Sequence, residues 1–239
     1  MRGGAPVSDW PGADRRRPVS TSPTWTVRKP LAEWLQRQAV EAARDYGRYR
    51  VLDVGSGIKP YYPFFEPFAD EFVGVDPSPQ ADLQGTVEAL PVEDASFDLV
   101  LCTQVLEHCD DPARAVSELR RVVRPGGRVL ASTHGVYPYH PAPVDYWRWT
   151  HTGLDRLFRE NADWSSVAVH PGSGTTACIG MLIGHFIDLL CKRAHLRPLG
   201  RPLVAGINLA ADAIDRAVPA LRDPLPGSLT ANYHVEAIA

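Results

Sequence analysis

The residues best suited to chemistry form a glycine turn between two short apolar runs. Residues 51–57 read Val-Leu-Asp-Val-Gly-Ser-Gly, and residues 72–76 read Phe-Val-Gly-Val-Asp. A strand, a tight glycine turn and an acid at the end of the next strand together make a nucleoside-binding arrangement. Asp76 would then accept hydrogen bonds from both hydroxyls of a ribose.

The details of the turn favour S-adenosylmethionine (SAM) over a dinucleotide. A dinucleotide fingerprint, Gly-x-Gly-x-x-Gly, needs its third glycine for close packing of helix and strand. Gly55 and Gly57 fit this spacing, but the third place is Pro60, and Asp53 would crowd a pyrophosphate. SAM has no phosphate and carries a cationic methionine end, so an acid beside the turn is useful. A nucleotide-linked oxidoreductase remains the rival interpretation, which Asp53 and Pro60 oppose.

A second group of reactive side chains lies in residues 134–149, a segment dense in aromatic residues and prolines. Prolines stiffen such a loop, and aromatic rings can stack on a sugar or aryl ring. His140 and Asp145 could form a general base and the residue that orients it. A base is needed when the acceptor is a hydroxyl, because a hydroxyl is a poor nucleophile. The alternative is that both residues only hold the loop, and both interpretations stay open.

Length and charge limit the class of protein. The chain has 239 residues, 44% of them hydrophobic, a formal charge of -3 and a pI near 6.2. One α/β domain fits this length. Because there is no overall basic field, a nucleic-acid partner is not expected. The basic run at 15–17 lies in residues 1–24, which we expect to be a disordered leader before a domain at 25–239. No apolar run follows it, which argues against a secretory signal and for a cytoplasmic location.

The four cysteines match no zinc spacing, so we expect free thiols in a reducing compartment and no metal site.

Alternating apolar runs and helical patterns predict an α/β fold with a doubly wound sheet. One helix is expected from Pro30 to about Asp45, because proline suits a first turn. Another begins with Asp111 as its N-cap and Pro112 at its first position, and a third covers about 152–160. Strands are expected at 50–54, 72–75, 97–102, 128–132, 166–169 and 228–238, with a short extended piece at 81–85. Ligands of such sheets bind at the carboxyl ends of the strands.

Residues 175–221 read as two apolar helices inserted before the last strand, and we expect them to cap the acceptor side. The stretch 175–191 is nearly long enough to span a membrane, but it contains His185 and Asp188. A charge inside a span is costly, which favours a core or lid helix. Its hydrophobicity still permits peripheral membrane contact or a lipid-linked acceptor.

Taken together, these segments resemble the class I SAM-dependent methyltransferases, in particular the type 11 group. The resemblance covers about residues 49–161 and rests on segments in the family's order and spacing: 51–57, 74–76, 89–98, 105–108 and 119–127. It implies a Rossmann-like sheet of seven strands, the last one antiparallel and supplied by 228–238. It also implies SAM as the cofactor. Type 11 proteins with a similar His-x-x-Pro-x-Asp-Tyr segment often resemble sugar or cell-envelope enzymes.

The resemblance assigns roles at the glycine turn. Asp53 and the backbone of Gly55, Ser56 and Gly57 would surround the methionine and sulfonium portion of SAM. Asp76 would bind the ribose.

Further positions follow from the same resemblance. Pro77 would lie beside the adenine, and Gln104 would face the methionine. The family often has an acid and an alanine where this chain has Thr86 and Val87, so the adenine contact would rest on a hydroxyl and on the Val87 backbone. A frequent third glycine is replaced by Lys59.

The sequence therefore predicts a SAM-dependent methyltransferase acting on a small-molecule, glycan or lipid-linked acceptor, most readily at oxygen. The alternative is a methyltransferase fold kept as a binding or regulatory subunit with weak or no catalysis. The departures at Thr86 and Lys59 keep this alternative open.

Overall fold

The computed structural model describes residues 10–239 and contains one mixed sheet of seven strands. The strand order is β3-β2-β1-β4-β5-β7-β6. The first five strands run parallel, whereas β7 runs antiparallel to both β5 and β6. The strands are β1 (Tyr49–Val54), β2 (Ala69–Asp76), β3 (Leu83–Gln84), β4 (Phe97–Thr103), β5 (Val123–His134), β6 (Ser166–Pro171) and β7 (Asn232–Ile238). The predicted doubly wound sheet with an antiparallel last strand is confirmed.

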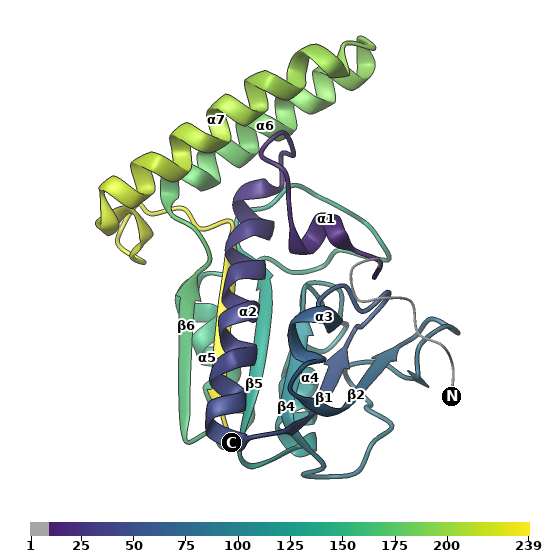
Figure 1. Cartoon of the computed structure of the whole chain (residues 1–239). Coiled ribbons are helices and arrows are strands. Elements are labelled where there is room, and N and C mark those ends of the chain that lie inside the picture. The colour runs from purple at the N-terminus through teal and green to yellow at the C-terminus, as the bar shows by residue number, and fades with distance from the viewer. Residues whose placement is uncertain (1–9) are drawn as a thin grey trace.

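Helices cover both faces of this sheet (Figure 1). The long helix α2 crosses one face, and α4 and α5 lie on the other. The predicted cap of α4 is present, because the Asp111 side chain accepts a hydrogen bond from the Arg114 N–H at 3.0 Å and Pro112 opens the helix. The helices are α1 (Ala13–Arg16), α2 (Trp25–Tyr46), α3 (Tyr62–Phe65), α4 (Pro112–Val122), α5 (His151–Asn161), α6 (Thr175–Arg193), α7 (Arg197–Ala217) and the short 3-10 helix η2 (Pro219–Arg222).

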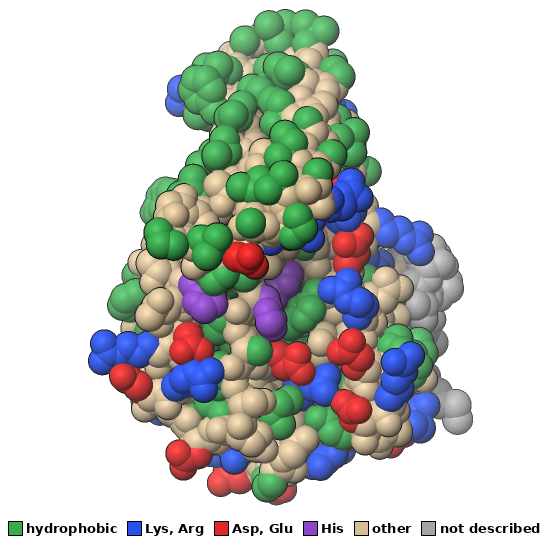
Figure 2. Space-filling model, turned by 90° about the vertical axis from the view of Figure 1, so that its left-hand side faces the viewer, with side chains coloured by type: hydrophobic (Ala, Val, Ile, Leu, Met, Phe, Trp, Pro, Cys, Tyr) green, Lys and Arg blue, Asp and Glu red, His purple; other side chains and the backbone are tan. Residues whose placement is uncertain are grey.

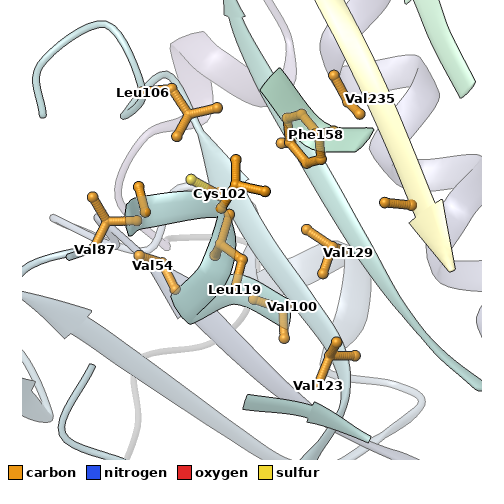
Figure 3. Packing of buried hydrophobic residues seen from close by; sticks show 14 of the residues in the cluster. Val54, Val87, Val100, Cys102, Leu106, Leu119, Val123, Val129, Phe158 and Val235 are labelled. Carbon is orange, nitrogen blue, oxygen red and sulfur yellow. The ribbon is translucent and has the colours of Figure 1, made fainter. Parts of the chain in front are cut away.

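The core consists of two apolar layers separated by the sheet. Alternate residues of a strand point to opposite faces, so Val51 joins the layer under α2 while Leu52 joins the layer under α4 and α5. In the second layer Leu119 of α4 and Phe158 of α5 pack against Val100 and its neighbours (Figure 3). Because both faces are covered, the central strands contain continuous apolar runs, such as residues 99–102 of β4. This rigid sheet fixes the positions of the loops at its carboxyl edge.

The segment before α2 differs from its prediction. Residues 10–24 are ordered: the Trp10 indole N–H donates to the Lys59 carbonyl at 2.8 Å, and the Arg16 guanidinium donates to the Pro60 carbonyl at 2.6 Å. The disordered leader expected through residue 24 is therefore wrong for this part, and residues 1–9 lie outside the described residues. The reason is a set of contacts across more than 40 positions, which composition alone does not reveal.

The first long helix also starts earlier than predicted. It begins at Trp25, which places Pro30 inside the helix rather than in its first turn. Trp25 and Val27 are buried, and the Thr26 hydroxyl donates to the Ala177 carbonyl of α6 at 3.4 Å. Packing against the C-terminal helices therefore extends α2 toward its N-terminus.

Helices α6 and α7 form an antiparallel hairpin that projects beyond the edge of the sheet (Figure 1). Small residues allow the two helices to approach closely, because a Cβ on Gly180 would lie 3.2 Å from the Ala211 Cβ. The base of the hairpin is fixed by Asp215, which is fully buried in α7 and accepts hydrogen bonds from the Thr176 and Ala177 N–H groups at 3.1 and 3.0 Å. A carboxylate from one helix thus caps the N-terminus of the other.

Candidate active site

One cavity of about 600 Å³ opens at the carboxyl ends of β1, β2 and β4. This is the edge at which open α/β sheets bind their ligands, and the volume suits a ligand of nucleoside size. Eight of the eleven predicted site residues line it: Gly55, Gly57, Asp76, Pro77, Thr86, Val87, Gln104 and His140. The other three, Asp53, Ser56 and Asp145, are not part of the lining, and their side chains are almost fully buried.

The glycine turn is built by close packing between β1 and the loop after β4. Gly55 has a φ of +67°, and a Cβ there would lie 2.3 Å from a methyl carbon of Val105. Only glycine fits such a position without strain. The Gly55 and Ser56 N–H groups both donate to the Val75 carbonyl, at 2.8 and 3.1 Å, which ties the turn to β2.

Asp76 ends β2 and faces the turn. Its carboxylate accepts hydrogen bonds from the Gly57 N–H at 3.0 Å and from the Ser78 N–H at 2.9 Å. These two bonds hold the side chain in place, and a carboxylate retains further acceptor capacity. The arrangement suits an acceptor for ribose hydroxyls.

Asp53 and Ser56 provide buried polar atoms behind the turn. Asp53 is 3% exposed, its Oδ2 has no hydrogen-bond partner among the described residues, and the Ser56 hydroxyl also lacks one there. Burial raises the pKa of Asp53 to about 7, with Lys59 opposing the shift. Unsatisfied buried carboxylates are costly, so a nearby cationic group would stabilise Asp53. These residues fit the positively charged end of SAM.

Gln104 offers a hydrogen-bond acceptor at the same end of the cavity. Its side-chain amide N–H groups donate to the Ser132 hydroxyl at 2.9 Å and to the Asn232 side chain at 2.8 Å. Because both donors face the protein, the group that Gln104 can offer a ligand is its carbonyl oxygen. Its φ of +58° places it in a left-handed turn directly after β4.

Thr86 and Val87, which are expected to contact the adenine, line the cavity, and so does Glu88, which was not predicted. The Glu88 carboxylate accepts a hydrogen bond from the Asp110 N–H at 2.9 Å. An acid is therefore present near the place where Thr86 lacks one. Glu88 could have been found from the sequence, because it lies only two residues after Thr86, the position where the family often has an acid.

On the opposite side, His140 and Asp145 lie together as predicted, but Asp145 has a second partner. The His140 Nδ1 and the Asp145 carboxylate are 3.3 Å apart without the angle of a hydrogen bond, while the His140 backbone N–H donates to the same carboxylate at 3.0 Å. Arg148 binds both Asp145 oxygens, at 2.5 and 2.6 Å, and this lowers the pKa of Asp145. Burial lowers the pKa of His140, so its imidazole is neutral at pH 7.

A second histidine–carboxylate pair lies beside the first and was not predicted as a pair. The His134 Nε2 and the Glu107 carboxylate are 3.1 Å apart, both residues are almost fully buried, and the Thr133 hydroxyl donates to Glu107 at 2.8 Å. The His134 ring stacks on Tyr137 with centroids 3.8 Å apart. Burial raises the pKa of Glu107 and lowers that of His134. The two residues are 27 positions apart, so only the fold reveals their contact.

These histidines also approach metal-ligand spacing. Glu107, His134 and His140 place ligand atoms within 4.8 Å of one another, as do His108, His140 and Asp145. The charge of Asp145 is already compensated by Arg148, and Glu107 and His134 can share a proton. The absence of a metal site stays a prediction.

Two arginines contribute positive charge to the cavity from the N-terminal part of the chain. Arg15 of α1 and Arg28 of α2 both line it, and Arg28 pairs with Asp14 at 2.6 Å. The ordered segment before α2 therefore forms part of the site, although the sequence placed it in a leader.

Comparison with known proteins agrees with the fold. Residues 52–131, which contain the second half of β1, β2 to β4, α4 and most of β5, match the family model of a methyltransferase domain. This part of the chain therefore matches a methyltransferase domain with a Rossmann-like fold, and the predicted resemblance to the type 11 group is confirmed.

The relatives found by sequence include several uncharacterized methyltransferases. The uncharacterized methyltransferase YcgJ of Bacillus subtilis is 31% identical over 112 residues, which are 40% of this chain and 44% of that protein. An uncharacterized methyltransferase of Mycobacterium sp. (strain KMS) is 32% identical over 164 residues, 59% of this chain and 65% of that protein. The chain thus matches about half to two thirds of these relatives' length.

Solved structures share the fold at low sequence identity. The [4+2]-cyclase SpnF superposes with a TM-score of 0.54 and 19% identity, covering 87% of this chain and 80% of SpnF. A putative sarcosine dimethylglycine methyltransferase from Galdieria sulphuraria superposes with a TM-score of 0.54 and 14% identity, covering 88% of this chain and 87% of that protein. At this identity the likeness concerns the fold alone. Because a cyclase is among these structures, the reaction must be argued from the site.

Proposed function

We propose that the protein is a SAM-dependent methyltransferase that methylates a hydroxyl of a small-molecule, glycan or lipid-linked acceptor. The observation that carries this proposal is that one cavity contains both the nucleoside-binding residues Gly55 and Asp76 and the neutral imidazole of His140. The comparisons support methyltransferase chemistry without specifying an acceptor.

SAM, when bound, supplies a methyl group on a good leaving group. Asp76 would accept the ribose hydroxyls, and the carbonyl oxygen of Gln104 together with Asp53 would attract the cationic methionine end. Glu88 and the Val87 backbone are the groups available for the adenine. Proximity and alignment of this kind can contribute about 7–11 kcal/mol to a two-substrate reaction.

His140 would act as the general base through Nε2, because Nδ1 faces the Asp145 carboxylate. The acceptor hydroxyl would lose its proton to His140 as its oxygen attacks the methyl carbon and the carbon–sulfur bond breaks. Asp145 acts here as a positioning residue, since Arg148 already compensates its charge. Arg15 and Arg28 would favour an acceptor that carries an anionic group such as a phosphate.

We expect His140→Gln to lower the turnover of methyl transfer by about 10²- to 10⁴-fold. The affinity for S-adenosylhomocysteine, the demethylated product of SAM, should stay within a few-fold of wild type. The assay follows labelled methyl from SAM into a panel of polyol, glycoside and polyprenyl-phosphate sugar acceptors. His170→Gln, on the exposed part of β6, is the matched control and should transfer normally. Because the pKa of His140 lies below its ordinary value of 6.5, the wild-type rate should rise with pH through a pKa below 6.5 and then level off.

Three results would count against this proposal. An unchanged acidic limb in His140→Gln would assign the base elsewhere, with His134 and Glu107 as the next pair. Methylation at nitrogen or carbon would refute the oxygen target. SAM binding without transfer to any acceptor would favour the alternative, a binding or regulatory subunit. The cytoplasmic location also stays a prediction.

A further inference from the structure

The hairpin of α6 and α7 exposes apolar side chains at an unusual density. Of the 21 large hydrophobic residues that are exposed in the described part of the chain, ten lie between residues 179 and 214. On the face drawn in Figure 2, hydrophobic side chains gather on the upper protrusion of the molecule. Phe186 is 61% exposed, Leu199 69% and Leu203 56%. Soluble proteins rarely leave so large a contiguous apolar patch in water, so it marks an interaction site.

Positive charge is concentrated at the free end of this hairpin. Residues 189–211 contain Lys192, Arg193, Arg197 and Arg201 and no acidic residue. Asp188 pairs with Lys192 at 3.2 Å and approaches Arg197 at 3.9 Å, whereas Arg193 and Arg201 form no ion pair within residues 10–239. The tip, which we define as residues 186–203, thus combines exposed leucines with uncompensated arginines.

This combination matches an anionic lipid surface. Helices that lie in the headgroup region bury an apolar face while basic residues contact lipid phosphates. A transmembrane arrangement fits less well: α6 is long and apolar enough by composition, but it contains Asp188, Lys192 and Arg193, and α7 adds two more arginines near the tip. Charges at these positions favour the interface over the hydrocarbon core.

A second copy of the chain is a poorer occupant of the same surface. If the tips of two copies met, the four basic residues of one tip would face the four basic residues of the other, and like charges repel each other. At the base of the hairpin, Asp212 already pairs with Arg216 at 2.8 Å, and Asp215 is fully buried as a helix cap. Neither carboxylate is available to a partner's arginines.

We propose that the hairpin docks the protein on anionic membranes through its basic apolar tip. The middle of α6 approaches the site: the His185 ring lies 5.9 Å from the Tyr137 ring, and Tyr137 stacks on His134 in the cavity. Docking therefore holds the cavity near the lipid surface, where the acceptor is an amphiphile whose polar hydroxyl-bearing group enters the cavity. This last step rests on the proposed function, whereas docking itself does not.

The test is co-sedimentation of the full chain with phosphatidylcholine vesicles that contain or lack phosphatidylglycerol. Wild type should bind the anionic vesicles and lose binding as salt rises. Arg193→Glu/Arg201→Glu should weaken binding by about ten- to a hundred-fold. Leu199→Ser/Leu203→Ser should weaken it as well, and because these side chains are exposed the fold should be unaffected. Arg44→Glu/Arg156→Glu, which reverses two exposed charges elsewhere, should bind as wild type.

Failure of wild type to bind anionic vesicles would overturn the proposal. Binding of both tip variants with the same affinity as wild type would also overturn it. A dimer in light scattering that disappears in Leu199→Ser/Leu203→Ser, without vesicle binding, would assign the tip to protein contact instead. Binding of S-adenosylhomocysteine, measured on the same samples, separates the two hypotheses. Absence of this binding would contradict the proposed function, whereas its presence without vesicle binding would contradict only the docking proposal.

Discussion

Asp53 is the residue whose environment says most about the ligand. It is 3% exposed, and burial raises the pKa of its carboxyl group to about 7. A group with this pKa is partly protonated in the free protein near neutral pH. A cation bound beside it would favour the charged form and lower the pKa toward the ordinary value.

We therefore expect a proton to be released when S-adenosylhomocysteine, the demethylated product of SAM, binds at a pH just below 7, because its ammonium group lowers the pKa of Asp53. The measurement is calorimetry in buffers of different ionisation enthalpy, where release appears as a buffer-dependent binding enthalpy. Asp53→Asn should bind without this dependence. Glu107→Gln is the control, since burial also raises the pKa of Glu107 to about 7. Equal enthalpies in all buffers for wild type would contradict the role given to Asp53.

At the scale of elements, a buried carboxylate fixes the base of the hairpin. Asp215 accepts two N–H groups from the first turn of α6, and a Cβ on the neighbouring Gly174 would lie 2.5 Å from it. The contact is close and leaves no space for a substitute partner. Asp215 therefore ties the first turn of α6 to α7 at the base of the hairpin.

Asp215→Ala should lower the free energy of unfolding by about 1–3 kcal/mol, because two helix N–H groups lose a buried charged acceptor. For a chain of this size each kcal/mol corresponds to about 2–4 °C, so the melting temperature should fall by several degrees. Asp212→Ala is the matched control: it removes a neighbouring acid of α7 that pairs only with arginines, and it should change the melting temperature little. An equal fall in melting temperature for both substitutions would show that the hairpin is stabilised by the negative charge of these acids and not by capping of α6.

The sequence predicted those elements whose signals are local. Asp111 and Pro112 mark the start of α4 with their own chemistry, and Gly55 marks the turn because a side chain is not tolerated there. Contacts between distant residues were not predictable. The pairing of Glu107 with His134 and the binding of Arg16 to the Pro60 carbonyl arise only when the sheet brings separate loops together.

At the scale of the whole molecule, charge and apolar surface are distributed unevenly. The net charge is -3, yet the hairpin tip is basic and apolar, while the acidic residues Asp76 and Glu88 line the cavity and Asp53 is buried behind the glycine turn. One end of the molecule thus suits a cationic nucleoside cofactor and the other an anionic surface. The loop containing His140 lies between them.

The most direct test of the central claim is calorimetric titration of S-adenosylhomocysteine into wild type, Asp76→Ala and Asp70→Ala, with NAD as a second ligand. Asp70 lies near the start of β2, is exposed and pairs with Arg48, so it controls for loss of an acid from the same strand. Our account predicts binding to wild type and Asp70→Ala, loss of at least about tenfold in affinity for Asp76→Ala, and no binding of NAD. Failure of wild type to bind S-adenosylhomocysteine, or unchanged affinity in Asp76→Ala, would contradict it.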